Sequence, residues 1–162
     1  MILIGIGSSL AFCGAPPQAV VRTAIRAIAS VAEVQAVSSL YASPAWPNPA
    51  DPPFVNAAVA VRTELTPEKL MDALHAIEAA FGRVRRRKNE PRTLDLDLLS
   101  YGGIVQDGEG GRPILPHPAL STRDFALAPI AEIAPDWRCP RAGHSAAVML
   151  GALKDLSAVA IS

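Results

Sequence analysis

Residues 94–98 alternate between leucine and aspartate, and this pattern limits what the chain can fold into more than any other. Successive side chains of a strand point to opposite faces, so the alternation predicts a strand over Thr93–Leu99 with its leucines facing a core. Asp95 and Asp97 then share the other face. Aspartate is a poor strand former, and two like charges on one face repel each other. A divalent cation such as Mg²⁺ would neutralise them, and the alternative is an ordinary solvated face.

The segments before this strand predict the element order β-α-β-β-α-β. Apolar periodicity and turn residues indicate strands at Ile2–Ile6, Val34–Ser43 and Phe54–Thr63 and helices at Pro17–Val31 and Pro67–Phe81. Thr66 is placed to cap the second helix and Gly82 to end it. We therefore expect an α+β fold of the ferredoxin-like type, an α/β sandwich with two helices on one face of an antiparallel sheet. Helices near Arg123–Ile133 and Ser145–Leu156 would be C-terminal additions, and the segment after Trp137 is expected only to pack.

Size and charge fit one domain over residues 1–162. Half of the residues are hydrophobic and fifteen basic side chains balance fifteen acidic ones, so an anionic ligand needs a local basic cluster. Cys13 and Cys139 are too few for a disulfide framework and are expected to be ordinary buried thiols. The N-terminus lacks the features of a signal peptide, and no apolar run reaches the roughly 18 residues of a membrane span. We therefore expect a cytoplasmic protein.

Basic side chains gather just before the two aspartates, at Arg83, Arg85, Arg86, Arg87, Lys88 and Arg92. Guanidinium groups bind phosphate oxygens through paired hydrogen bonds, and phosphoryl transfer depends mainly on positioning and charge neutralisation. Two acids for Mg²⁺ and a basic loop for phosphates favour a nucleotide site, whereas a solvated loop or a nucleic-acid patch is the alternative. Gly5 and Gly7 lack the spacing of a P-loop, and we expect them to form a strand-to-helix turn.

Further polar residues and one loop are candidates for the site. His75 and Glu78 stand three apart on the second predicted helix, away from its apolar stripe, and are either surface residues or ligands of a nucleotide. His117 lies between two prolines with Arg123 beyond, an arrangement that suits either a structural role or phosphate binding. The proline-rich stretch Pro44–Pro53 must be a loop, and a long loop inside a compact domain is more often functional than idle.

Taken together, these segments resemble one known family. The matching stretches are FVNAAV (Phe54–Val59), GRVR (Gly82–Arg85), PRTLDLDLL (Pro91–Leu99), LPHP (Leu115–Pro118) and RDF (Arg123–Phe125). From Ile4 to about Trp137 the chain resembles the 6-hydroxymethyl-7,8-dihydropterin pyrophosphokinases of folate biosynthesis. The resemblance implies that the β,γ-diphosphate of ATP moves to the pterin hydroxymethyl oxygen, releasing AMP, with ATP as co-substrate and two Mg²⁺ ions.

The resemblance also implies roles for individual residues. It places Mg²⁺ on Asp95 and Asp97 and charge neutralisation of the transferring diphosphate on Arg83 and Arg92. It implies ATP contacts for His75, Glu78, Arg85, His117 and Arg123. On the pterin side it implies stacking by Phe54 and Phe125, reading of the pterin edge by Asn56, and a lining loop with Ser43, Pro44 and Trp46. The loops Ser43–Pro53 and Arg83–Pro91 would close over the reactants.

Some positions depart from the family pattern. Asn89 and Glu90 stand where the family commonly has an aromatic residue and a glycine, and Ser9 stands where it usually has asparagine. These changes bear on catalytic efficiency and on the exact pterin, so one alternative is a divergent member that binds without efficient turnover. The other alternative is an RNA-binding module, which the chain disfavours because its strands lack the aromatic residues such a sheet uses. We expect a monomer that binds neither nucleic acid nor membrane.

Overall fold

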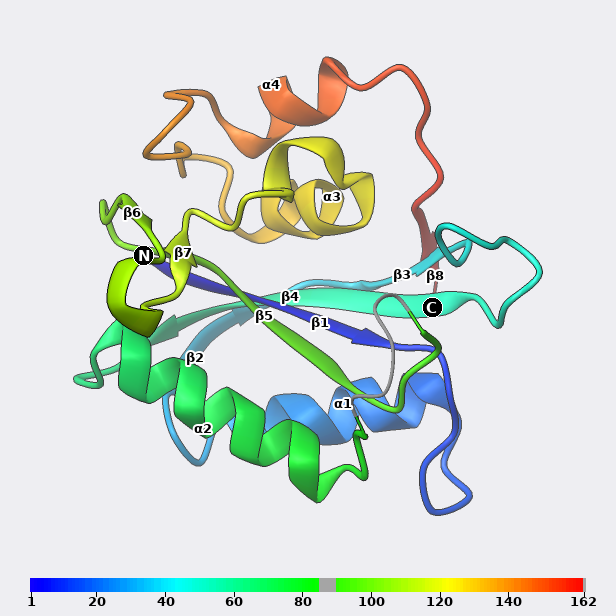
Figure 1. Ribbon diagram of the computed structural model, residues 1–162. Coiled ribbons are helices and arrows are strands. Elements are labelled where there is room, and N and C mark those ends of the chain that lie inside the picture. The colour runs from blue at the N-terminus through cyan, green and yellow to red at the C-terminus, as the bar shows by residue number, and fades with distance from the viewer. Residues whose placement is uncertain (85–89, 162) are drawn as a thin grey trace.

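One antiparallel sheet separates two layers of helices (Figure 1). The computed structural model describes residues 1–84 and 90–161. Its elements are β1 (Ile2–Ser8), α1 (Pro17–Ile28), β2 (Glu33–Val37), β3 (Leu40–Ser43), β4 (Phe54–Arg62), α2 (Pro67–Ala80), β5 (Asp95–Tyr101), β6 (Gln106–Asp107), η1 (Glu109–Gly111), β7 (Ile114–Leu115), η2 (Leu120–Thr122), α3 (Asp124–Ile133), α4 (Ala146–Gly151) and β8 (Val159–Ile161).

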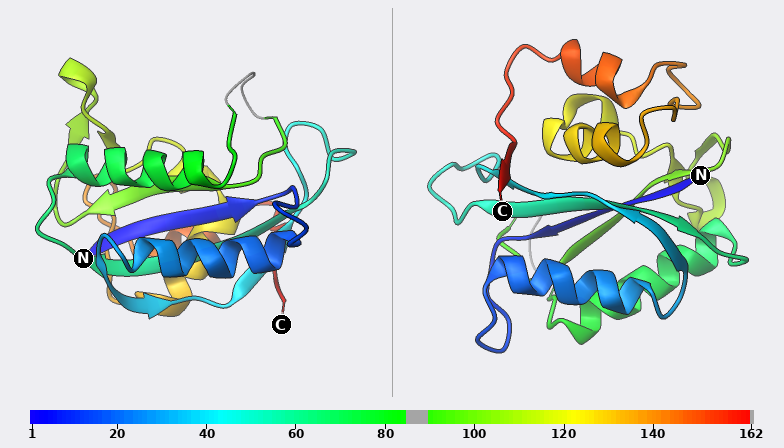
Figure 2. Two further views of the ribbon diagram at one scale, coloured as in Figure 1. Left: turned by 90° about the horizontal axis from the view of Figure 1, so that it is seen from below. Right: turned by 180° about the vertical axis from the view of Figure 1, so that it is seen from behind.

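The sheet has the strand order β5-β1-β4-β3-β8, and β2 also pairs with β4. Helices α1 and α2 cover one face, whereas α3 and α4 cover the other (Figure 2). The first five strands and two helices thus have the arrangement predicted from the order β-α-β-β-α-β, and the expected ferredoxin-like fold is confirmed. The long central strands β1 and β4 carry most of the ladder, pairing from Ile2↔Val61 to Ser8↔Val55.

Two hydrophobic cores lie on the two faces of the sheet. Alternate residues of β4 divide between them, because successive side chains of a strand point to opposite sides. Val59 and its neighbours two residues away pack against α1 and α2, whereas Ala58 and Ala60 pack under α3. The small alanines let α3 approach the sheet closely. Within the described ranges 1–84 and 90–161, no helix is long and apolar enough to cross a membrane.

The sequence signals at the two ends of α2 were accurate, whereas the first helix, predicted to reach Val31, ends at Ile28. The Thr66 hydroxyl accepts a hydrogen bond from the Lys69 N–H at 3.3 Å and caps α2. Gly82 has a φ of 71°, a left-handed conformation that favours glycine and ends the helix. Leu94, which precedes β5, and Leu96 and Leu98 of that strand face the first core, as the alternation predicts.

Several predicted boundaries were wrong. The strand expected over Val34–Ser43 is two strands, because the Ser38 hydroxyl accepts from the Ala58 N–H and breaks the pairing. The fourth helix ends at Gly151, and the chain then runs extended into β8. The strand expected from Thr93 begins at Asp95, because the Arg92 carbonyl is held by the N–H groups of Ser9 and Leu10. Cys139 is buried as expected, but Cys13 is exposed, and both are free thiols.

Candidate active site

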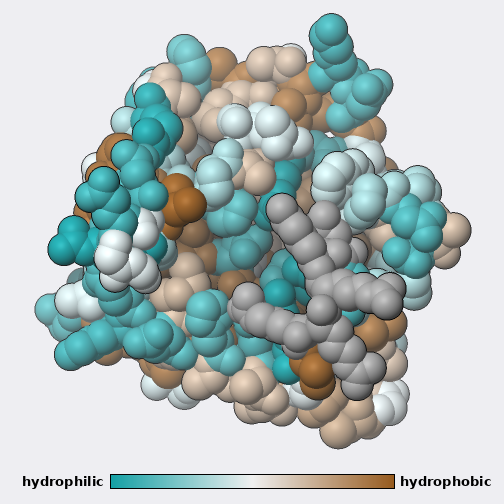
Figure 3. Space-filling model, in the orientation of Figure 1, coloured by the Kyte–Doolittle hydropathy of each residue, from teal (hydrophilic) through white to brown (hydrophobic). Residues whose placement is uncertain are grey.

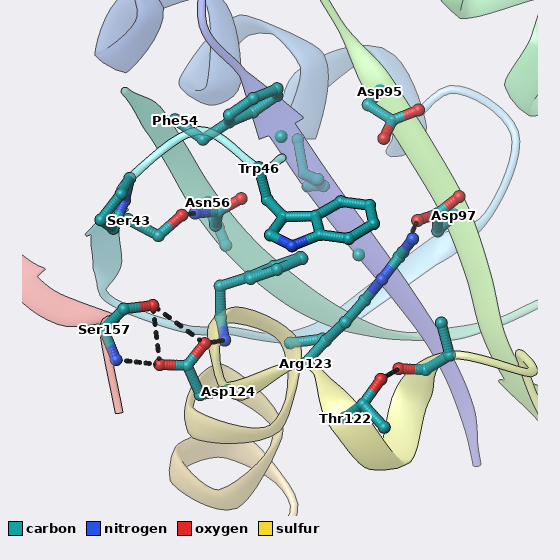
Figure 4. A pocket seen from close by; sticks show the side chains of 18 of the residues that line it. Ser43, Trp46, Phe54, Asn56, Asp95, Asp97, Thr122, Arg123, Asp124 and Ser157 are labelled. Carbon is teal, nitrogen blue, oxygen red and sulfur yellow. Dashed lines mark hydrogen bonds and ion pairs between the residues drawn. The ribbon is translucent and has the colours of Figure 1, made fainter. Parts of the chain in front are cut away.

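A cavity of about 540 Å³ opens between the sheet and the N-terminal end of α3. Figure 3 shows that the face toward the viewer is hollowed near its middle, with hydrophilic residues in the hollow. Ten of the residues predicted for the site line this cavity: Ser43, Pro44, Trp46, Phe54, Asn56, Arg92, Asp95, Asp97, Arg123 and Phe125 (Figure 4). They come from the end of β3 and the loop after it, from β4, from β5 and the segment before it, and from the start of α3, so distant parts of the sequence converge there.

The floor of the cavity is formed by two glycines of β1. Gly5 pairs with Asp97 and Gly7 pairs with Asp95 in the β1–β5 register. A Cβ atom at Gly7 would lie 3.4 Å from the Asn56 amide oxygen, so any side chain there would enter the cavity. The turn expected for these glycines is therefore wrong. They lie inside a strand and leave space above it, and glycines two residues apart in an apolar strand were the available signal.

The two aspartates are each paired with arginines. Arg92 Nη1 lies 3.0 Å from Asp95 Oδ2, and Arg83 Nη1 lies 2.6 Å from Asp95 Oδ1. Arg123 Nη1 lies 3.1 Å from Asp97 Oδ2. Burial, together with the charge of Asp95, raises the pKa of Asp97, although His117 and Arg123 oppose the shift. Carboxylates and guanidinium groups thus alternate along this side of the cavity. The arginine side chains could turn from the aspartates toward a bound phosphate.

Figure 4 shows Asp95 and Asp97 on one side of the cavity, from β5, with both carboxylates on the same face of the strand. Among the residues that the structure describes, no group of three or more His, Cys, Asp or Glu side chains is arranged to hold a metal. Two carboxylates suffice for Mg²⁺, which keeps several waters and takes further oxygens from substrate phosphates. The donor set therefore fits magnesium that arrives with a nucleotide.

His117 lies at the edge of the aspartate pair, outside the residues that line the cavity. Its Nδ1 accepts a hydrogen bond from the Ala119 N–H at 3.2 Å, which leaves the proton of the neutral ring on Nε2. Nε2 lies 3.9 Å from Asp97 Oδ1. Burial lowers the pKa of His117, although the Asp97 carboxylate opposes the shift, so the ring is neutral at pH 7. It can donate from Nε2 to an oxygen at Asp97.

Glu78 occupies a different place from the one that the sequence suggested. It lies on the inner face of α2, with only 3% of its side chain exposed, so a surface role is wrong. Its Oε1 accepts from the Leu96 N–H at 2.7 Å and is paired with Arg83 Nη1. Since Arg83 also contacts Asp95, Glu78 holds both the arginine and β5 in place. This position behind the aspartates suits a structural support.

Replacing Glu78 with alanine is expected to lower the free energy of unfolding by about 3 to 5 kcal/mol, because it leaves a buried arginine and a strand N–H without this acceptor. Glu33→Ala is the matched control, since the Glu33–Arg62 pair is exposed and such pairs contribute about 0 to 1 kcal/mol. Urea unfolding of both variants measures the difference. Equal losses in the two variants would contradict the assignment.

The opposite side of the cavity is aromatic. Phe54 begins β4 and Phe125 lies in the first turn of α3, and each carries an arginine near its ring. The guanidinium carbon of Arg92 is 6.0 Å from the Phe54 ring centroid, and that of Arg123 is 5.6 Å from the Phe125 centroid. Asn56 Nδ2 donates to the Ser43 hydroxyl at 2.8 Å, which fixes the amide of Asn56. Two rings and one oriented amide suit a flat heterocycle with polar edges.

Three other predicted residues stand apart from the cavity lining. His75 is exposed on α2, and Arg83 lies behind Asp95 with 12% of its side chain exposed. Arg85 and Asn89 lie outside the described residues. Trp46 lines the cavity but is 73% exposed, near the start of the proline-rich loop that joins β3 and β4.

Sequence reasoning missed the C-terminal part of the cavity. Asp124, Asp155 and Ser157 line it, and the expectation that everything after Trp137 only packs is therefore wrong. The Asp124 carboxylate accepts hydrogen bonds from the backbone N–H groups of Ser157 and Ala158 and from the Ser157 hydroxyl. It also accepts from the Phe125 N–H at 2.8 Å. No spacing rule connects residues 33 positions apart, so this contact had no signal in the sequence.

The Asp124 contacts predict a pH-dependent stability. Burial alone would raise the pKa of Asp124, but the N–H groups of Ser157, Ala158 and Phe125 and the Ser157 hydroxyl hold it below its ordinary value. A depressed carboxyl pKa stabilises the fold above the unfolded pKa, and the effect is lost as the pH falls through the folded pKa. Asp124→Asn is expected to lower the free energy of unfolding by about 1 to 3 kcal/mol at pH 7.

The difference in the free energy of unfolding between the wild type and Asp124→Asn should narrow as the pH falls below about 4, the ordinary pKa of an aspartate, and the native carboxylate takes up its proton. Denaturant unfolding at several pH values measures it. A difference that stays constant over this range would contradict the assignment of the hydrogen bonds to the ionised carboxylate.

Comparison with known proteins places this geometry in context. Residues 3–135 match the family model of the 7,8-dihydro-6-hydroxymethylpterin-pyrophosphokinase (HPPK). A 2-amino-4-hydroxy-6-hydroxymethyldihydropteridine pyrophosphokinase of Pseudomonas aeruginosa is 41% identical over 146 residues, 88% of this chain and 86% of that protein. The Synechocystis protein of the same name is 47% identical over 124 residues, 75% of this chain. That match spans 62% of the length of the Synechocystis protein.

A solved structure has a similar fold. The crystal structure of a triple mutant of Plasmodium falciparum HPPK-DHPS with pteroate matches with a TM-score of 0.68 at 8% sequence identity. The match covers 93% of this chain and 42% of that one. At this identity the likeness concerns the fold alone.

Proposed function

Because the chain belongs to the 7,8-dihydro-6-hydroxymethylpterin-pyrophosphokinase family, we propose that it transfers a diphosphate from ATP to 6-hydroxymethyl-7,8-dihydropterin in folate biosynthesis. The hydroxymethyl oxygen attacks the β-phosphorus and forms the new P–O bond. The bond from the β-phosphorus to the oxygen that bridges it to the α-phosphorus breaks, and AMP leaves with that oxygen and the bonding electrons. The hydroxyl proton passes to solvent.

The proposal rests mainly on one observation: groups suited to phosphate and groups suited to a flat heterocycle line the same cavity. Carboxylates and guanidinium groups of β5 and its neighbours lie on one side, and two phenylalanine rings with an oriented amide lie on the other. Catalysis of phosphoryl transfer consists mostly of placing the reactants and neutralising charge. A cavity with carboxylates and guanidinium groups at one end for the metal-bound diphosphate and an aromatic end for the pterin does both.

Asp95 and Asp97 would hold the magnesium ions, two in number, that enter with the triphosphate. When bound, the ions draw electron density from the phosphate oxygens and offset charge that develops on the leaving group. Arg92 and Arg123 form ion pairs with Asp95 and Asp97 in the structure. Once magnesium neutralises these carboxylates, the two arginines would turn toward the phosphates. Arg83 stays between Glu78 and Asp95 and supports the ligand carboxylate.

The pterin would lie between Phe54 and Phe125, with Asn56 reading its polar edge. Ser43 fixes the Asn56 amide, and Pro44 and Trp46 close the entrance. The rings set the plane of the heterocycle, which directs its hydroxymethyl group toward the phosphate end of the cavity. Roles for His75 and Arg85 at the nucleotide remain predictions.

We propose further that residues 1–162 form one domain that acts as a monomer in the cytoplasm, with ATP and the pterin as its small-molecule partners and without nucleic acid or membrane. The support for one domain is that helices cover both faces of a single sheet and that the cavity lies on that sheet. Light scattering with and without substrates gives the mass in solution, and a dimer mass would contradict the monomer.

The test of the function is a coupled assay for AMP with ATP, Mg²⁺ and 6-hydroxymethyl-7,8-dihydropterin, run in parallel without the pterin. We expect pterin-dependent AMP, no ADP, and a pterin product heavier by a diphosphate in mass spectrometry. Formation of ADP and a pterin monophosphate would contradict the proposal. Binding of both substrates in calorimetry without AMP would instead identify a divergent member that lacks efficient turnover.

A further inference from the structure

The C-terminal strap, which we define as residues 153–158 between α4 and β8, forms part of the cavity wall. Asp155 and Ser157 of the strap line the cavity together with Ser43 and Phe125. Figure 4 shows Ser157 beside Asp124 on the side of the cavity away from Asp95 and Asp97. The family match ends at residue 135, so the strap lies beyond the part of the chain that the family model describes.

Asp124 fixes the last two residues of the strap. Its Oδ2 accepts from the Ala158 N–H at 2.7 Å and from the Ser157 hydroxyl at 3.1 Å, and it also binds the Ser157 N–H. Asp124 is 6% exposed, and its backbone directly precedes Phe125. One buried carboxylate therefore ties the strap to the residue before a ring at the aromatic end of the cavity.

The end of the strap is held by the sheet. Beyond it, β8 pairs antiparallel with β3 in the register Leu40↔Ile161, Tyr41↔Ala160 and Ala42↔Val159. The next residue of β3 is Ser43, whose hydroxyl accepts from Asn56 Nδ2. The strap is thus joined to both sides of the aromatic end, to Phe125 through Asp124 and to Ser43 through β8.

The carboxylate of Asp155 indicates which of the two substrates, the pterin or the triphosphate, the strap suits. Arg92 and Arg123 line the cavity near Asp95 and Asp97, whereas the strap contributes the exposed residue Asp155 to the lining. Lys154, the other charged residue of the strap, is not among the lining residues. A carboxylate repels phosphate oxygens but accepts hydrogen bonds from N–H groups. A dihydropterin carries an amino group and ring N–H groups and no negative charge, so the strap fits the heterocycle and not the triphosphate.

We propose that the C-terminal strap is a binding element for the pterin, with Asp155 as an acceptor for its N–H groups and Asp124 as the positioning residue that holds the strap and Phe125 together. This rests on the proposed function. The strap then contributes to selectivity for a neutral heterocycle that carries N–H donors, independently of the residues that handle phosphate.

The experiment measures dissociation constants by calorimetry, with Mg²⁺ and the α,β-methylene analogue of ATP first, and then with 6-hydroxymethyl-7,8-dihydropterin added to that complex. Asp124→Ala and Asp155→Ala are each expected to weaken pterin binding about tenfold, as loss of charged hydrogen-bond acceptors does. Binding of the nucleotide analogue should change less than about twofold, since among the described residues neither carboxylate forms an ion pair with an arginine. Asp124→Asn keeps one acceptor oxygen and should give an intermediate value.

Glu132→Gln is the matched control. Glu132 also lies on α3 and accepts from the Ser39 N–H and hydroxyl and from the Tyr41 hydroxyl, but it contacts neither the cavity nor the strap. We expect it to leave pterin affinity unchanged. A loss of pterin affinity in Glu132→Gln equal to that in Asp124→Ala would assign the effect to general loosening of α3 and overturn the proposal.

Hydrogen exchange of the unmodified chain keeps the proposal testable if Asp124→Ala does not fold. Peptides covering residues 153–158 should exchange more slowly when pterin joins the nucleotide complex. Protection of residues 54–56 without protection of the strap would overturn the proposal while leaving the pyrophosphokinase intact. Absence of pterin binding by the wild type would instead contradict the proposed function itself.

Discussion

Replacing Asp97 with alanine is expected to abolish diphosphate transfer while the protein stays folded. Loss of one of the two carboxylates that we propose as metal ligands would remove charge neutralisation that arises only in the transition state, so the rate should fall at least about a thousandfold. The fold should tolerate the change. Burial and the neighbouring charge of Asp95 raise the pKa of Asp97, so its ionised form costs stability above the unfolded pKa.

The variants Asp97→Ala and Asp97→Asn should therefore unfold at temperatures equal to or above that of the wild type. Thermal unfolding followed by circular dichroism measures this, and the coupled AMP assay measures the rate. Asp107→Asn is the control, because Asp107 lies in β6 and pairs with Arg141 on the exposed surface. Full activity in Asp97→Ala would contradict the proposed role of Asp97 in metal binding. Loss of activity together with unfolding would instead assign Asp97 a structural role.

Arg92→Ala should lower kcat by about a hundredfold to a thousandfold and change the KM for either substrate by much less. Arg92 lies between the two ends of the cavity, on Asp95 and near the Phe54 ring, where the new P–O bond would form. Its backbone is fixed as well, since its carbonyl accepts from Ser9 and Leu10. A positioned guanidinium at this point stabilises charge as it develops on the transferring group.

Steady-state kinetics with each substrate varied in turn separate kcat from KM for this variant. Arg62→Ala is the matched control, because Arg62 forms an exposed pair with Glu33 on β2 and lies away from the cavity. A change confined to KM would make Arg92 a ground-state binder. Activity near that of the wild type would remove it from the catalytic machinery.

The parts of the fold that the sequence predicted are those governed by local rules. The alternation around Asp95 and Asp97 predicted which side chains face the core, because the two-residue period of a strand needs no knowledge of its neighbours. Thr66 and Gly82 marked the ends of α2 for the same reason, since each acts on backbone groups within one turn.

The parts that the sequence did not predict depend on pairing between distant segments. Gly5 and Gly7 read as a turn because nothing local says that they pair with Asp97 and Asp95. From the sequence, Glu78 was interpreted as either a surface residue or a nucleotide ligand, because its partner N–H belongs to Leu96, on another element. Such contacts follow from register and topology, which the spacing of one segment does not contain.

The candidate site also has a part that the sequence predicted and a part that it did not. Its acidic and aromatic residues occur in motifs, and the order of these motifs along the chain indicated the family before the structure was known. The strap did not, because Asp124 contacts backbone N–H groups of residues 157 and 158, and any sequence would offer these. A segment that is held in place through its backbone N–H groups can be recognised only in the folded structure.

The central claim is that one cavity holds the pterin at its aromatic end and the metal-bound diphosphate on Asp95 and Asp97. A crystal structure with the pterin, α,β-methylene ATP and Mn²⁺ in place of Mg²⁺ tests it most directly, because manganese is located by its anomalous signal. We predict anomalous peaks within coordination distance of both carboxylates and the pterin ring between Phe54 and Phe125. Nucleotide and pterin bound with no metal at either aspartate, or with the pterin outside the two rings, would contradict the account.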